Sequence, residues 1–261
     1  MVDRVSSQHI RRIILEQSCR AHVGHIGPAL SVVEIIAALY GRVLRIPGPD
    51  APERDRFILS KGHAALALYA ALFLRGFITG EQLAGFCTDG TMLGVHPEHV
   101  LPGVDFSTGS LGHGLAFGVG AALAARLGGS GRRAYALLSD AECNEGSVWE
   151  AAMFASHHRL GALTAIVDNN GQQALGKTAA ILDLEPLADK WRAFGWQTVE
   201  VDGHDLDALG DAIGSPPGDV PRAVIASTVC GRGVSFMEGK VEWHYLPMTE
   251  AQYLRALAEV G

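Results

Sequence analysis

The sequence lacks the features of secreted, membrane-spanning and disulfide-stabilised proteins. No apolar run approaches the ~18 consecutive residues that cross a bilayer, and the N-terminus contains no apolar core of a signal peptide. Cysteine is scarce, and its four residues lie far apart without a Cys-x-x-Cys pair, at Cys19, Cys87, Cys143 and Cys230. Free thiols in a reducing compartment are expected, and we predict a cytoplasmic protein without a membrane partner.

Basic residues are in the minority, with 21 Lys and Arg against 28 Asp and Glu and a net charge of -7. Because no basic block interrupts this balance, nucleic acid is not expected as a partner. A phosphorylated ligand remains compatible, since backbone amides or a few local cations can bind it. No linker, repeat or low-complexity stretch is present. Residues 1–261 are therefore expected to form a single domain.

Short apolar segments alternate with segments of helical periodicity along the chain. Strands are predicted at residues 56–60, 134–138, 163–167, 198–201 and 223–227. Helices are predicted at residues 31–44, 64–75, 115–127, 147–159 and 187–194, with others near residues 10 and 206. Capping boxes at Thr79 and Thr249 predict two more helix starts. The alternation predicts an α/β fold: a doubly wound, mostly parallel sheet with helices on both faces.

Polar residues follow two of the predicted strands, where ligands bind in such sheets. Asp140 follows the strand at 134–138, and Asn170 follows the strand at 163–167. Adjacent parallel strands lie ~4.8 Å apart, so the two side chains can share a cation that prefers oxygen ligands, such as Mg²⁺. Two alternatives stay open at this point. Asp140 could be a helix N-cap, and Asn170 with Gly171 could form a plain turn.

At these residues the sequence resembles a known family. The segments 139–141 and 168–170 are similar to the metal-binding signature of thiamine diphosphate enzymes, in its transketolase form. Further ordered matches to transketolases cover nearly the whole chain, at residues 24–27, 59–64, 96–98, 108–112, 145–151, 202–205 and 243–244. The resemblance implies the thiamine diphosphate-binding fold of the N-terminal, diphosphate-binding subunit of a split transketolase.

The resemblance also implies a set of cofactor and metal contacts. Asp140, Asn170 and the main-chain oxygen of Gln172 are the expected ligands of Mg²⁺ or Ca²⁺. His63 and His244 are expected to contact the diphosphate. The remaining cofactor-binding residues are Gly109, Ser110, Leu111, Ala141 and Glu142.

Catalytic roles follow from the same resemblance. His25 and His96 are expected near the reactive carbon of the thiazolium, and His244 is a further expected catalytic residue. Imidazole titrates near neutral pH, so His25 and His96 are candidates for proton shuttling. Glu145 resembles an acidic residue that couples paired active sites.

Several positions depart from the family pattern or have other interpretations. Ala141 replaces a glycine, which costs about 1 kcal/mol if the backbone needs a positive φ. His113 and Pro28 are also unusual, and they put the choice of substrate in doubt. His22 and His25 could form a zinc pair, although no third ligand lies nearby in the sequence. His204 is expected to be a structural loop residue.

The resemblance implies transfer of a two-carbon ketol unit from a ketose or ketose phosphate to an aldose. The resemblance extends to residue 261 and stops before the pyrimidine-binding domain that it would lead into. We therefore expect a C-terminal partner subunit and an α2β2 assembly. Two alternatives remain: a related carboligase or 2-oxoacid-decarboxylating subunit, and a catalytically silent cofactor-binding subunit. The sequence does not indicate which sugar is used.

Overall fold

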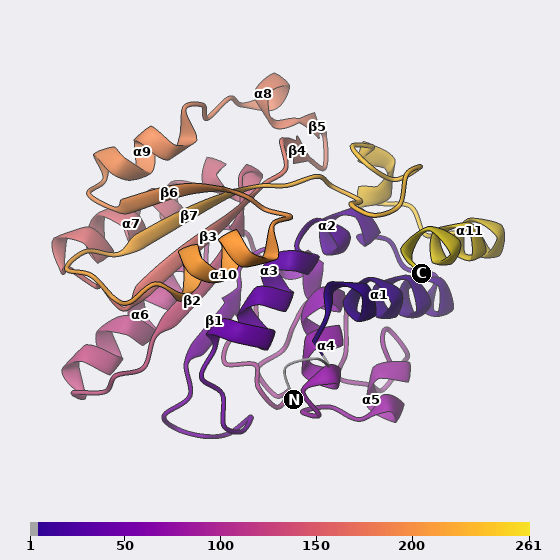
Figure 1. Ribbon diagram of the computed structural model, residues 1–261, viewed down its shortest axis with the longest axis horizontal. Helices are drawn as coiled ribbons and strands as arrows, with labels where there is room; N and C mark the ends of the chain where they lie inside the picture. The colour runs from indigo at the N-terminus through magenta and orange to yellow at the C-terminus, as the bar shows by residue number, and fades with distance from the viewer. Residues whose placement is uncertain (1–4) are drawn as a thin grey trace.

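The computed structural model describes residues 5–261 and contains a five-stranded parallel sheet (Figure 1). The strand order is β1-β2-β3-β7-β6. The bounds are β1 Arg56–Leu59, β2 Ala134–Ser139, β3 Leu163–Asn169, β7 Arg222–Ser227 and β6 Gln197–Asp202. The predicted α/β class is confirmed, because every strand pair of this sheet is parallel.

Helices cover both faces of the sheet (Figure 1). Alternate strand residues face opposite sides, as period-two geometry requires: Phe57 and Leu59 belong to one apolar core and Ile58 to the other. The first core is completed by α1 Ser7–Ala21, α3 Val33–Ala38, α4 Ala65–Leu74, α10 Leu206–Gly214 and α11 Glu250–Val260. The second is completed by α6 Gly114–Leu127, α7 Gly146–His157 and α9 Leu187–Ala193. Strands β1, β2, β3 and β7 are therefore buried on both sides, whereas the edge strand β6 is partly exposed.

The predicted helix at 31–44 is wrong in its bounds. Helix α2 already begins at residue 26 (Ile26–Ser31), and the chain leaves helical geometry at Val32, with φ −102° and ψ 9°. Helix α3 then follows and ends in a π-helical turn, Leu39–Val43. Next to the break, the Ser31 hydroxyl donates to the Asp168 carboxylate (2.7 Å) and so attaches the end of α2 to the sheet.

Both predicted capping boxes are present, at α5 (Gly80–Ala84) and at α11. The sequence did not predict the antiparallel hairpin of β4 (Gln172–Gln173) and β5 (Gly176–Lys177), nor the short helix α8 (Thr178–Ile181). In residues 5–261, no helix is long and apolar enough to cross a membrane.

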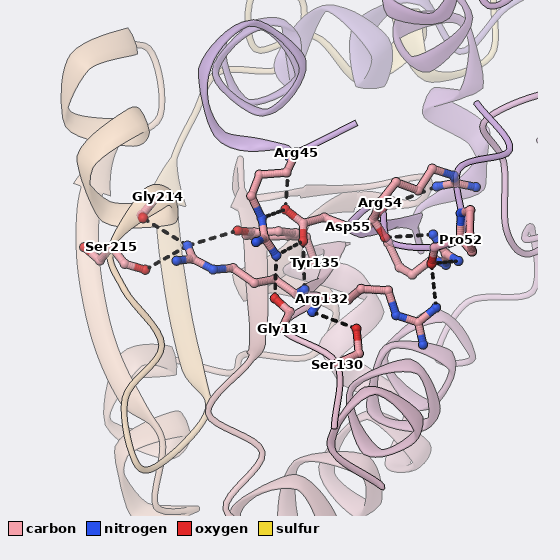
Figure 2. A network of polar contacts seen from close by, with 12 residues as sticks. Arg45, Pro52, Arg54, Asp55, Ser130, Gly131, Arg132, Tyr135, Gly214 and Ser215 are labelled. Carbon is pink, nitrogen blue, oxygen red and sulfur yellow. Dashed lines mark hydrogen bonds and ion pairs between the residues drawn. The ribbon is translucent and has the colours of Figure 1, made fainter. Parts of the chain in front are cut away.

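A polar network lies where strands β1 and β2 begin, at the opposite edge of the sheet from their carboxyl ends (Figure 2). Asp55 is fully buried, and its carboxylate accepts from the backbone N–H groups of Arg45 (3.0 Å) and Arg133 (2.8 Å). Arg45 also forms an ion pair with it (2.8 Å). A buried carboxylate needs such paired donors to offset its desolvation. This network fixes the loops at that edge. The carboxyl ends of the strands, where ligands bind in such sheets, lie at the other edge.

Candidate functional site

A cavity of about 480 Å³ opens at the carboxyl edge of the sheet. It is lined by residues that follow β1, β2, β3 and β7 and by loops from other parts of the chain. The sequence-predicted residues that line it are His25, His63, His96, Gly109, Leu111, Ala141, Glu145, Asn170, Gln172 and His244. The structure thus brings ten predicted residues together from distant parts of the chain.

Four of these residues form a histidine cluster. The ring centroid of His25 lies 5.5 Å from that of His63, 6.4 Å from that of His96 and 5.5 Å from that of His244. The rings of His63 and His244 are 5.2 Å apart. Such proximity disfavours more than one positive charge in the cluster.

Burial lowers the pKa of three of these histidines and keeps them neutral. It is the main cause that lowers the pKa of His63 well below its usual value, with the Lys61 ammonium as the next cause. Burial also lowers the pKa of His244 to about 4, and it lowers the pKa of His25. At neutral pH these imidazoles each hold one N–H donor and one free nitrogen acceptor. The cavity can therefore donate hydrogen bonds to an anion and also take up a proton.

Two glycines allow the backbone to bring these histidines close. A Cβ on Gly24 would lie 2.2 Å from the carbonyl oxygen of Tyr245. Beside it, the His25 N–H donates to the His244 carbonyl oxygen (3.3 Å). Gly109 has a φ of +150°, and a Cβ there would lie 3.1 Å from the His96 ring. A side chain at either glycine would displace a cavity histidine.

Asp140 has one satisfied and one unsatisfied carboxylate oxygen. Its Oδ2 accepts from the Gly171 N–H (3.0 Å) and the Thr178 hydroxyl (2.8 Å). Its Oδ1 is buried and has no hydrogen-bond partner within the described part of the chain. Burial raises the pKa of this carboxyl to about 6. An orphaned buried oxygen of this kind fits a metal ligand.

The two alternatives for the strand ends have different outcomes. Asp140 does occupy the N-cap position of the 3-10 turn Ala141–Asn144, but its side chain makes no capping bond to that turn. The turn at Asn170 does exist, since its Oδ1 accepts from the Gln172 N–H (2.9 Å). The Asn170 amide nitrogen donates to Asp168 (3.0 Å), which fixes the amide orientation.

Three predicted residues do not line the large cavity. Asp140 lies beside it, in a small cavity of about 140 Å³ next to the hairpin. Ser110 is exposed and also outside the lining. Glu142 is fully buried; its carboxylate accepts from the Gly112 N–H (2.8 Å) and from the Ser60 hydroxyl. Glu142 therefore holds the glycine-rich turn in place behind the cavity.

The sequence interpretation missed the partners of Lys61. The ammonium forms an ion pair with Asp168, and both side chains are buried. Asp168 also accepts from the hydroxyls of Ser31 (2.7 Å) and Thr228. Lys61 stands in a family motif, but no spacing in the sequence indicates that it pairs with Asp168.

The unusual positions have simple structural explanations. Ala141 begins a 3-10 turn, so its Cβ meets no positive-φ strain. His113 is exposed and lies outside the cavity lining, whereas Pro28 lines the cavity. His204 is a loop residue whose Nδ1 bonds Glu34 (3.0 Å).

The zinc alternative for His22 and His25 lacks a third ligand. His22 is exposed, whereas His25 lines the cavity. Within residues 5–261, no three His, Cys, Asp or Glu side chains converge on a metal position. A ligand set of one carboxylate, one amide and one main-chain oxygen is of a different kind and is characteristic of hard cations.

The parallel sheet and the polar cavity at its carboxyl edge define an α/β ligand-binding domain. The family described as "Transketolase, thiamine diphosphate binding domain" matches residues 2–261, so the chain belongs to the transketolase family.

Similar proteins fall into two groups by length. The 6-deoxy-6-sulfo-D-fructose transketolase subunit SqwG of Clostridium sp. (strain MSTE9) is 43% identical over 256 residues, which cover 96% of this chain and 93% of that protein. One of the apulose-4-phosphate transketolase subunits of Phocaeicola vulgatus is 39% identical and is covered to 93%. The structure of a transketolase R525L mutant from Pichia stipitis has a TM-score of 0.91 and 30% identity. It covers all of this chain, but this chain covers only 41% of it.

Proposed function

We propose that this chain is the thiamine diphosphate-binding subunit of a two-subunit transketolase, which moves a two-carbon ketol unit from a ketose or ketose phosphate to an aldose. One observation carries the proposal: the chain covers 93% of relatives named as transketolase subunits, but 41% of a single-chain transketolase. The missing part, including the pyrimidine-binding domain, would come from a C-terminal partner subunit in an α2β2 assembly. Residues 1–261 would form one domain of this assembly.

The cofactor would be held by residues at the ends of β2 and β3. Asp140, Asn170 and the main-chain oxygen of Gln172 would bind Mg²⁺ or Ca²⁺, and the free Oδ1 of Asp140 supports this assignment. His63 and His244 would donate hydrogen bonds to the diphosphate. The turn at Gly109, Ser110 and Leu111 would lie against the cofactor, as would the 3-10 turn that contains Ala141 and Glu142.

The catalytic work of the chain would lie with the histidines of its cavity. When bound, thiamine diphosphate supplies the electron sink for breaking a carbon–carbon bond next to a carbonyl group. His25, His96 and His244 would hydrogen-bond the hydroxyl groups of the sugar and move its protons, since a neutral imidazole can accept and return one. Glu145 is exposed at the cavity and would couple paired sites across the assembly.

The cavity offers little to bind an anionic end of the sugar. Among the described lining residues, Lys61 is the one lysine or arginine, and Asp168 already neutralises it. Both relatives described above carry names of sugars with an anionic group, a sulfonate or a phosphate. We propose that the partner subunit binds that group and so selects the sugar.

The metal assignment is tested by calorimetric titration of the chain with thiamine diphosphate, with and without Mg²⁺. Asp140→Asn keeps the size of the side chain but removes the charge from the free oxygen. We expect metal-dependent affinity to fall at least about 10- to 100-fold, since even outer partners of a metal ligand have effects of this size. Asp189→Asn, on the exposed face of α9, is the matched control. Equal metal-dependent affinity for Asp140→Asn and wild type would contradict the assignment of Asp140 as a metal ligand.

Activity separates the proposed function from its alternatives. The chain is co-expressed with a candidate pyrimidine-binding subunit, and the purified pair is assayed with a ketose phosphate and with pyruvate. Turnover of pyruvate alone would favour the carboligase or decarboxylase alternative. No cofactor binding even in the pair would favour the silent subunit. Turnover at normal rates by the chain alone would contradict the need for a partner.

A further inference from the structure

The β4–β5 hairpin forms one side of the cavity and is attached at its base to Asp140. The hairpin residues Gln172, Gln173, Ala174 and Leu175 all line the cavity. At the base, the carboxylate of Asp140 accepts from the Gly171 N–H and the Thr178 hydroxyl. Each hairpin strand has two residues, and a ribbon this short is not stable without tertiary contacts. Its position therefore depends on what holds its free end.

The free end is held by the segment that follows β7. The hydroxyl of Tyr245 donates to the carbonyl oxygen of Ala174, near the tip of the hairpin. The side-chain amide of Gln172 donates to the carbonyl oxygen of Gly239 in the same segment. The hairpin is thus fixed at the base by Asp140 and at the tip by Tyr245.

Tyr245 is itself fixed to the histidine cluster through its backbone. Its carbonyl oxygen packs against Gly24, where a Cβ would lie only 2.2 Å away. The preceding residue, His244, accepts the backbone hydrogen bond from His25 (3.3 Å). The Tyr245 ring lies 5.3 Å from the His244 ring. A shift of the hairpin tip is therefore opposed by the segments that carry two cavity histidines.

We propose that Tyr245 is a positioning residue, which holds the hairpin 172–177 against the cavity and thereby places the main-chain oxygen of Gln172 for the metal ion. The inference rests on the proposed function, because it assumes the metal site of Asp140, Asn170 and Gln172. Without the hydroxyl, the hairpin occupies its binding position for a smaller fraction of the time. The apparent dissociation constant rises in inverse proportion to that fraction.

Tyr245→Phe tests this inference because it removes the hydroxyl and keeps the ring. Tyr245 is 51% exposed, so water can replace the lost hydrogen bond and the fold should persist. Hydrogen–deuterium exchange of the full chain should show at least threefold faster exchange for amides 172–177 and unchanged rates in the sheet. The dissociation constant for Mg²⁺ at saturating thiamine diphosphate should rise about 3- to 10-fold, the range for one neutral hydrogen bond.

Tyr253→Phe is the matched control, since Tyr253 lies on α11 outside the cavity lining. Unchanged exchange at the hairpin in Tyr245→Phe, or an unchanged Mg²⁺ dissociation constant, would overturn the inference. Faster exchange throughout the sheet would overturn it too, because it would show a general loss of stability. If wild type bound no Mg²⁺ with thiamine diphosphate even in the presence of the partner subunit, the metal site of the proposed function would fail instead. The exchange measurement would still decide whether Tyr245 holds the hairpin.

Discussion

Lys61 and Asp168 form a buried ion pair, with side-chain exposures of 1% and 0%, respectively. The pair joins the loop after β1 to the end of β3, directly beneath the cavity. Asp168 also accepts from Ser31 and from the amide of Asn170. The pair therefore links the packing of α2 to the orientation of a proposed metal ligand.

Breaking this pair should destabilise the protein strongly. Lys61→Met or Asp168→Asn leaves one buried charge without its partner, which costs about 3–5 kcal/mol. The measurement is the free energy of unfolding in urea. The double variant Lys61→Met/Asp168→Asn should lose less than the sum of the two single changes, because no unpaired charge remains. Arg12→Met, in an exposed ion pair on α1, serves as the control and should leave the unfolding midpoint unchanged. A strictly additive double variant would contradict the coupling.

Gly24 should tolerate no side chain. Gly24→Ala places a Cβ against the Tyr245 carbonyl group, so the segments of His25 and His244 must separate. We expect a loss of about 1–3 kcal/mol in unfolding free energy, the usual range for overpacking, together with weaker cofactor binding. Gly48→Ala is the control, because nothing lies within 4 Å of the added Cβ. Equal stability and binding in both variants would show that the close approach at Gly24 is unimportant.

The sequence predicted the sheet well because four of its five strands are buried on both faces. The strands β1, β2, β3 and β7 are short apolar runs, which apolarity alone can locate. The apolar pattern of the sequence did not reveal where α2 ends. Helices α2 and α3 are both buried throughout, so their residues show no polar face. Beside the break at Val32 lies the hydrogen bond from Ser31 to Asp168, a contact across 137 positions that no local pattern indicates.

The candidate site, too, was predictable only in part from the sequence. The resemblance located the histidines and the residues at the strand ends, and the structure places most of them around one cavity. It did not reveal the hairpin, because β4 and β5 have two residues each and are mostly polar. Nor did it reveal what Tyr245 contacts. For Glu142 the resemblance predicted a cofactor contact. In the structure, its carboxylate instead faces Ser60 and Gly112.

The histidine cluster predicts how stability depends on pH. Burial lowers the pKa of His244 to about 4 in the folded protein, whereas an unfolded histidine titrates near 6.5. Between these values the unfolded chain binds more protons than the folded one, so stability falls as the pH falls from about 6.5 towards 4. The contribution of His244 is fully present above pH 6.5, and His63 and His25 act in the same direction.

The measurement is the urea unfolding free energy of the chain at pH 7 and pH 5. Because His244 is partly exposed, we expect its share of the loss to be on the order of 1 kcal/mol. His244→Gln removes the titrating group, so this variant should lose less stability than wild type between the two pH values. His157→Gln, exposed at the end of α7, should lose as much as wild type. An equal loss in His244→Gln and wild type would contradict the lowered pKa of His244 in the folded protein.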